Sequence, residues 1–200
     1  MTTAEFDYIE SQRDRFLSDL KDWCSIPSVS ADSNFKNDVV HAAEWINKKL
    51  TGLGFQSEII PTAKHPVVVA ERKSSKPTSK TLLIYGHYDV QPADPHDLWH
   101  SDPFTPVIKD GYIFARGVSD MKGPTLISVF AIEALLKTYG DLPINIKFLI
   151  EGEEEIGSPS INDFLSTYKD RLQSDISLNL DAGMADITKP GIVYGLRGLA

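Results

Sequence analysis

The sequence predicts an α/β fold in which helices cover both faces of a central, mostly parallel, twisted sheet. Helical and strand-like patterns alternate along the chain, as they do where helices connect parallel strands. The strand-like segments are short apolar runs that contain many β-branched residues. The chain has 200 residues, of which 42% are hydrophobic and 24% are charged, so it is long enough and apolar enough to bury a core.

The first half of the chain is expected to form two helices followed by three strands. Apolar residues recur at helical spacing over residues 4–23 and again over residues 39–50. Ile26-Pro27-Ser28 ends the first helix, and Gly52 and Gly54 end the second. The expected strands are Phe55–Ile60, Val67–Ala70 and Thr81–Tyr85.

The second half is expected to begin with a hairpin and a buried helix. Asp110-Gly111 is a turn signal between the apolar runs Pro106–Lys109 and Tyr112–Ala115. Residues 124–138 are apolar on most sides, which indicates a helix buried between other layers. The remaining expected elements are a strand at Ile144–Ile150, a helix over residues 160–172, a strand at Ile176–Leu180 and the start of a strand at Ile192–Tyr194.

Composition argues against several classes of protein. Lys and Arg number 20 against 28 Asp and Glu, which gives a net charge of −8 without any basic block, so a nucleic-acid partner is not expected. Cys24 is the single cysteine, so it is expected to be a buried apolar side chain outside any intramolecular disulfide. No signal-peptide pattern and no apolar run near ~20 residues is present. A cytoplasmic protein without a membrane partner is expected.

Acidic and imidazole side chains recur directly after the predicted strands. His87 and Asp89, the acidic run Glu153–Glu155, and Asp181 each come just after such a strand. Asp120 lies in a glycine-bounded turn before the buried helix. Ligands of open α/β sheets bind at the carboxyl ends of the strands, so these side chains are expected to converge.

A cluster of this kind favours bound divalent cations. Carboxylates in one cleft raise each other's pKa unless positive charge neutralises them. Imidazole nitrogen with carboxylate oxygens suits zinc, manganese or cobalt, and the lack of thiolates argues against a structural zinc site. Asp89 lies two residues after His87, so in an extended strand it points the same way and can accept a hydrogen bond from the second ring nitrogen.

Three motifs follow one another along the chain. They are Gly86-His87-Tyr88-Asp89-Val90, Gly117-Val118-Ser119-Asp120-Met121-Lys122-Gly123 and Glu151-Gly152-Glu153-Glu154-Glu155-Ile156-Gly157-Ser158. In this order the sequence resembles a binuclear metallopeptidase family that includes carnosinase-type dipeptidases, carboxypeptidase G, acetylornithine deacetylase, succinyl-diaminopimelate desuccinylase and aminoacylase. Residues 85–92, and Trp99 followed by Asp102-Pro103-Phe104, are most similar to the dipeptidase branch.

The resemblance implies a zinc-peptidase-like catalytic domain that holds two divalent cations, with zinc expected and manganese or cobalt as alternatives. The implied metal ligands are His87, Asp120, Glu155 and Asp181, with Asp120 as the bridge between the ions. Glu154 would be the general base and Asp89 would orient His87. The peptide bond before Met121 is often cis in this family. The implied reaction is hydrolysis of a peptide bond, as in a dipeptide, or of an N-acyl amide bond by an activated water.

The resemblance also implies what lies outside the chain. Family members are about twice as long and usually form homodimers through a lid domain. Residues 1–200 are therefore expected to be a catalytic domain that is incomplete at its C-terminus, with the lid and dimerisation domain absent. The substrate would be a small peptide or an N-acyl amino acid.

Several alternatives stay open at this point. The chain could be a truncated metal-binding remnant without turnover, or a structural α/β module with acids on its surface. Glu153 is unassigned, because acids are common in the first turn of a solvated helix. A shift of one residue would exchange the roles of Glu154 and Glu155. Lys122 is interpreted as part of a structural ion pair, with substrate binding as the alternative.

Overall fold

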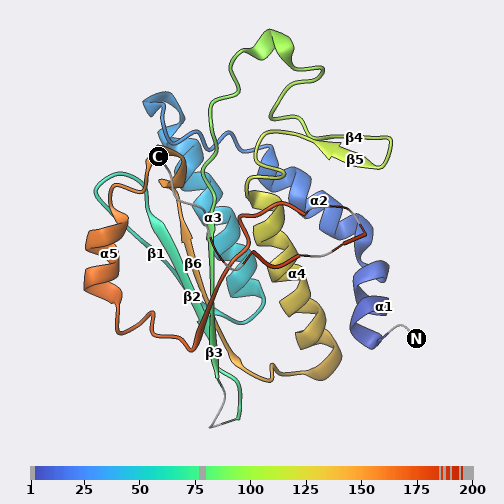
Figure 1. Cartoon of the computed structure of the whole chain (residues 1–200), viewed down its shortest axis with the longest axis vertical. Coiled ribbons are helices and arrows are strands. Elements are labelled where there is room, and N and C mark those ends of the chain that lie inside the picture. Colours follow the sequence, from blue (N-terminus) through green and yellow to red (C-terminus); the bar gives the residue numbers. More distant parts are fainter. Residues whose placement is uncertain are drawn as a thin grey trace.

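The computed structural model describes residues 3–76, 80–184, 186, 188–189, 191–193 and 195. Within those residues the chain forms a five-stranded sheet in the order β1-β2-β6-β3-β7 (Figure 1). The strands are β1 (Gln56–Ile60), β2 (Val67–Arg72), β3 (Thr81–His87), β6 (Asn145–Glu151) and β7 (Ile176–Asn179). All five were predicted, with ends that differ by one or two residues, so the α/β prediction is confirmed at the level of its elements.

The sheet is mixed, which corrects the expectation of a mostly parallel sheet. β6, β3 and β7 are parallel, whereas β1 pairs antiparallel with β2, and β2 pairs antiparallel with β6. The reason lies in the connection between β1 and β2, residues 61–66, which is too short for the crossover that parallel strands require. The chain reverses direction there, so that β2 pairs with β1 in the antiparallel orientation.

Helices cover both faces of the sheet (Figure 1). The main helices are α1 (Ala4–Ser11), α2 (Arg13–Cys24), α3 (Lys36–Gly52), α4 (Lys122–Tyr139) and α5 (Ile161–Tyr168). Alternate residues of β2 belong to different cores, as expected for a strand buried on both sides. Val68 packs with residues of α2, α3 and α4, whereas Val67 and Val69 pack with Phe164 of α5.

Two predicted helices differ in extent from those observed. The helix expected over residues 4–23 is broken at Gln12, which has φ −104° and ψ 6°. The Ser11 hydroxyl donates to the Tyr8 carbonyl oxygen there, a local bond that competes with the helix ladder. The helix expected over residues 160–172 ends at Tyr168. Of the strand start expected at Ile192–Tyr194, Tyr194 lies outside the described residues, and Ile192 and Val193 belong to no strand.

A long excursion separates β3 from α4. It contains the short helical turn η2 (His96–Leu98) and the predicted hairpin of β4 (Val107–Lys109) and β5 (Tyr112–Phe114). Asp110 and Gly111 at its tip have positive φ angles, 52° and 81°, as a two-residue hairpin turn requires. The excursion leaves the sheet after His87 and returns to the turn before α4 (Figure 1), so its two ends bracket the sheet edge where the acidic residues were predicted.

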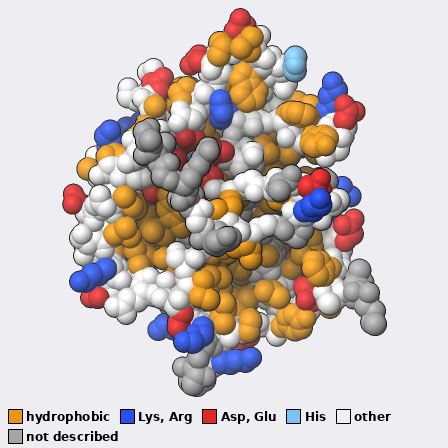
Figure 2. All heavy atoms as spheres, viewed as in Figure 1, with side chains coloured by type: hydrophobic (Ala, Val, Ile, Leu, Met, Phe, Trp, Pro, Cys, Tyr) orange, Lys and Arg blue, Asp and Glu red, His pale blue; other side chains and the backbone are white. Residues whose placement is uncertain are grey.

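Hydrophobic side chains are spread over much of the face seen in Figure 2, and charged ones lie mostly near its outline. β7 is an edge strand, and it leaves Ile176 and Leu178 exposed. In the part of the chain that the structure describes, no helix is long and apolar enough to cross a membrane.

Two isoleucines on α4 offer a test of this arrangement. Ile132 is 6% exposed in the helical core, whereas Ile127 is 66% exposed on the same helix. Ile132→Ala is expected to lower the free energy of unfolding by about 2–5 kcal/mol because it leaves a cavity. Ile127→Ala, the matched control with the same change of helix propensity, is expected to change it by less than about 0.5 kcal/mol. Urea denaturation measures both, and equal effects would contradict the packing of α4.

Candidate metal centre

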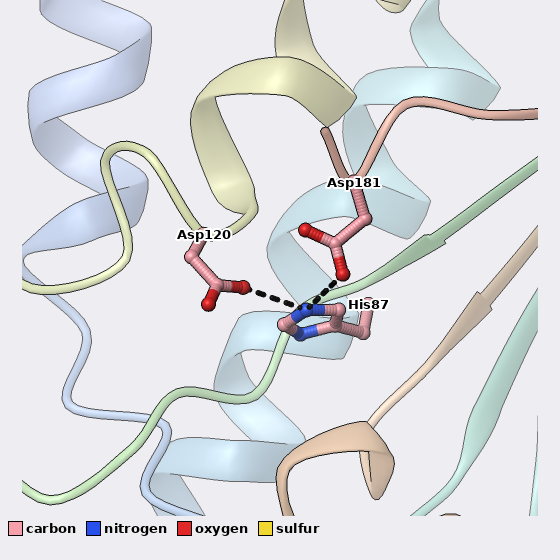
Figure 3. Close-up of side chains that lie close together, drawn as sticks. All are labelled: His87, Asp120 and Asp181. Carbon is pink, nitrogen blue, oxygen red and sulfur yellow. Dashed lines mark hydrogen bonds and ion pairs between the residues drawn. The ribbon is translucent and has the colours of Figure 1, made fainter. Parts of the chain in front are cut away.

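The parallel strands bring residues from distant parts of the chain to one edge of the sheet. His87 is the last residue of β3 and lies opposite Glu151 at the end of β6. The acidic run follows β6, and Asp181 follows β7 by two residues. Asp120 reaches the same place from the turn before α4, and Figure 3 shows the Asp120 and Asp181 carboxylates pointing toward the His87 ring.

One ring nitrogen of His87 faces three carboxylates. The distances from His87 Nε2 are 3.0 Å to Asp120 Oδ1, 3.7 Å to Asp181 Oδ2 and 3.8 Å to Glu154 Oε2. The His87 side chain is fully buried, while the three carboxylates are partly or largely exposed. The sheet edge therefore brings a buried nitrogen close to carboxylates that solvent can reach.

The other ring nitrogen of His87 faces Asp89. His87 Nδ1 lies 3.0 Å from the backbone oxygen of Asp89 and 3.4 Å from Asp89 Oδ1. A carbonyl oxygen accepts hydrogen bonds and cannot donate them, so Nδ1 carries a hydrogen. Nε2 faces carboxylate oxygens, which are also acceptors. Only a proton or a cation between them makes that arrangement favourable.

Asp89 connects His87 to the acidic run. Its carboxylate accepts hydrogen bonds from the backbone N–H groups of Glu154, at 3.3 Å, and Glu155, at 3.1 Å. The closer partner of the His87 ring is the Asp89 carbonyl oxygen, with the carboxylate slightly farther away. Asp89 is thus placed to orient His87 through its backbone as well as its side chain, whereas the sequence pointed only to the side chain.

The turn before α4 holds Asp120 through close backbone packing. The Lys122 N–H donates to the Gly117 carbonyl oxygen at 2.9 Å, and a Cβ on Gly123 would lie 2.0 Å from the oxygen of Val118. No side chain larger than hydrogen fits at Gly123. The peptide bond between Asp120 and Met121 is cis, as the resemblance implied.

Lys122 takes neither role that was expected of it. Its side chain is fully buried and donates to the backbone oxygens of Trp23, at 3.0 Å, and Ile26, at 2.8 Å. Trp23 lies in the last turn of α2 and Ile26 follows the helix by two residues, and the carboxyl end of a helix attracts a cation. Lys122 therefore ties the turn of Asp120 to the end of α2.

The three glutamates of the acidic run have different environments. Glu153 is buried and accepts hydrogen bonds from the N–H groups of His65 and Ser160 and from two hydroxyl groups, so the interpretation as a solvated helix start is wrong. Glu154 and Glu155 begin a single helical turn, η3 (Glu154–Ile156). Gln91 donates to Glu155 Oε2 at 2.7 Å.

The charges of the cluster are reflected in its pKa values. Burial alone would lower the pKa of His87, but the hydrogen bond and charge of Asp89, with the charge of Glu154, outweigh it and raise that pKa to about 9. Burial and neighbouring carboxylates raise the pKa of Glu154. Burial also raises the pKa of Glu155, and the charge of Asp120 adds to this. The site therefore favours bound positive charge.

Two groups of side chains have the geometry to hold a metal ion among the described residues. One comprises His87, Asp120 and Asp181, and the other comprises His87, Glu154 and Glu155; within each, the ligand atoms lie within 4.8 Å of one another. An imidazole nitrogen with carboxylate oxygens suits zinc, manganese or cobalt. The donors present thus fit such a cation, and Glu154 and Glu155 both belong to the second group.

Sequence reasoning missed two residues that support this centre. Gln91 contacts Glu155, and the Ser30 hydroxyl donates to Asp89 Oδ2 at 2.6 Å. The alternation of Ser28 and Ser30 with apolar residues was a usable signal, because polar residues at a spacing of two in an extended segment share one side.

The family model described as "Peptidase family M20/M25/M40" matches residues 83–194. The chain belongs to this peptidase family. The match contains all three motifs, from the strand that carries His87 to the segment beyond Asp181.

Curated relatives resemble almost the whole chain. It is 34% identical to the Cys-Gly metallodipeptidase dug1 of Schizosaccharomyces pombe, over 97% of this chain and 43% of that protein. It is 35% identical to the Beta-Ala-His dipeptidase of Homo sapiens, over 96% of this chain and 41% of that protein. The chain therefore spans about two fifths of the length of these relatives.

The crystal structure of human carnosine dipeptidase 1 has a similar fold. The TM-score is 0.82 at 35% sequence identity, and the match covers 88% of this chain and 40% of that chain. The mixed sheet and the helices around it therefore match part of a known dipeptidase structure.

The raised pKa of His87 can be measured directly. After removal of metal by a chelator, its imidazole is expected to titrate near pH 9 instead of 6.5. Because the pKa is raised in the folded state, the stability that His87 contributes is fully present below pH 6.5 and is lost as the pH rises through about 9. NMR titration of the ring reports the pKa, and Asp89→Asn is expected to lower it. An ordinary imidazole pKa in the unchanged protein would contradict the charge cluster.

Proposed function

We propose that this chain carries the catalytic site of a metal-dependent peptidase that hydrolyses dipeptides or N-acyl amino acids. The observation that carries the proposal is the position of His87 Nε2, which lies within 3.0–3.8 Å of oxygens of three carboxylates. In a peptidase family whose similar members are dipeptidases, a divalent cation is the natural positive charge for that position.

The chain's own residues divide into ligands and catalytic groups in this proposal. The ligands are His87, Asp120, Glu155 and Asp181. Asp120 would be the ligand shared by two ions, for which zinc is preferred and manganese or cobalt are alternatives. Cations held there supply a positive field that makes a water more acidic and stabilises negative charge on the scissile carbonyl oxygen.

Glu154 is the general base in this proposal. It takes a proton from the attacking water and delivers it to the leaving amine. Its side chain is 37% exposed, so water and substrate can reach it. Burial and the neighbouring carboxylates raise its pKa, which favours a group that both accepts and returns a proton near neutral pH. Asp89 holds His87 with Nε2 facing the centre.

The substrate class is proposed from the relatives. The yeast relative is named for Cys-Gly and the human one for Beta-Ala-His, so both names describe small peptides with different side chains. We therefore propose a small peptide substrate for this chain.

A second candidate is a metal-binding protein without turnover. It is favoured by one observation: among the described residues, the two metal-binding groups share a single imidazole, His87. A second ion would then have carboxylate ligands only, which hold zinc less selectively than nitrogen does.

Glu154→Gln separates the base from the ligands. This change is expected to leave zinc or manganese content unchanged and to lower dipeptide hydrolysis by about 10²–10⁴-fold, because it removes the proton acceptor but keeps the side-chain volume. Glu155→Gln is the matched control, since it changes the neighbouring glutamate identically. It is expected to lower metal content because it weakens a ligand.

Elemental analysis after dialysis and a dipeptidase assay with added zinc or manganese measure these outcomes. Loss of metal in Glu154→Gln with retention in Glu155→Gln would show that the two roles are exchanged. No bound transition metal in the unchanged chain would contradict the proposed function, and bound metal without turnover would favour the second candidate.

A further inference from the structure

A buried serine lies directly behind the metal centre. Ser30 is 7% exposed, and its hydroxyl donates to Asp89 Oδ2 at 2.6 Å. Its segment runs beside the end of β3: Val29 and Val90 form a parallel bridge, and the Val90 N–H donates to the Ser28 carbonyl oxygen at 3.0 Å. The residues just after α2 thus form an extended support for the strand end that carries His87.

The Asp89 carboxylate accepts hydrogen bonds at both of its oxygens. Oδ1 accepts from the Glu154 N–H and lies 3.4 Å from His87 Nδ1. Oδ2 accepts from the Glu155 N–H at 3.1 Å and from Ser30 at 2.6 Å. Three hydrogen-bond donors among the described residues thus reach this carboxylate, and the hydroxyl of Ser30 makes the shortest of these contacts.

Ser30 is itself held in place from the opposite side. His65 Nε2 lies 3.1 Å from the Ser30 carbonyl oxygen, which can only accept, so this nitrogen carries the hydrogen. The backbone N–H of His65 donates to Glu153 Oε1 at 2.8 Å. The segment of Ser30 is therefore tied both to the Asp89 carboxylate and, through His65, to the residue before Glu154.

We propose that Ser30 is a positioning residue of the metal centre. Its hydroxyl fixes the rotation of the Asp89 carboxylate, and through that carboxylate it fixes the His87 ring and the backbone of Glu154 and Glu155. This inference rests on the proposed function, because Ser30 would support the ligands of the same proposed metal centre. Loss of such a supporting hydrogen bond typically weakens metal binding by about 10–100-fold.

Ser28 provides a matched control on the same segment. It is fully buried, and its hydroxyl donates to the Tyr88 carbonyl oxygen, also at 2.6 Å. Its hydroxyl bonds the backbone and no carboxylate of the centre. Ser28→Ala and Ser30→Ala therefore delete the same atom, two residues apart, and only the second deletion reaches Asp89.

Cobalt(II) is a suitable probe, since its affinity is measured by calorimetry and its visible absorption reports the geometry of the ligands. Ser30→Ala is expected to bind cobalt about 10–100-fold more weakly and to change the absorption spectrum. Ser30→Thr, which keeps a hydroxyl, is expected to restore both. Ser28→Ala is expected to keep the affinity and spectrum of the unchanged chain, even where urea denaturation shows a lower free energy of unfolding.

Unchanged affinity and spectrum in Ser30→Ala would overturn the inference, and so would equal losses in Ser28→Ala and Ser30→Ala, since the segment would then act only through stability. Failure of the unchanged chain to bind cobalt would contradict the proposed function and this inference together. Normal binding by the unchanged chain with no effect of Ser30→Ala would contradict this inference alone.

Discussion

Several carboxylates lie close to one buried imidazole nitrogen, that of His87, and the arrangement of the candidate metal centre depends on this crowding of negative charge. The strands β3, β6 and β7 run in parallel, so the segments after them deliver their side chains to one edge of the sheet. Carboxylates at such spacing destabilise each other unless a proton or a cation lies between them. The raised pKa of His87 shows the same electrostatic demand, which a divalent cation satisfies more fully than a proton.

The fold surrounds this charge with buried polar groups that have partners. Asp89 and Glu153 are buried, and each accepts several hydrogen bonds from the backbone. Lys122 is buried against the end of α2. Burying a charge without such partners costs several kcal/mol. These contacts therefore stabilise the segments that carry Asp89, Glu153 and Lys122. The side chains of the centre are held in position because the buried polar groups around them have hydrogen-bond partners.

Local patterns in the sequence predicted most elements and the convergence of the acidic residues at the strand ends. Apolar spacing located the strands that carry His87 and precede Asp181, because both are short runs rich in apolar residues, and this held even for β7, whose residues are exposed at the sheet edge. The order of strands was not predictable in the same way, since the insertion of β6 between β2 and β3 is set by packing between distant segments. The alternation of Ser28 and Ser30 was a signal for a shared face, but it did not indicate the partner Asp89, which is far away in sequence.

Family membership and geometry support each other in different ways. The comparisons place the chain among peptidases of family M20/M25/M40, whereas the structure shows which side chains meet and what charge they favour.

Anomalous diffraction from crystals grown with zinc tests the central claim most directly. A zinc peak about 2.0–2.2 Å from His87 Nε2 and from carboxylate oxygens of Asp120 and Asp181 is predicted. A site without zinc, or zinc bound only elsewhere, would contradict the account.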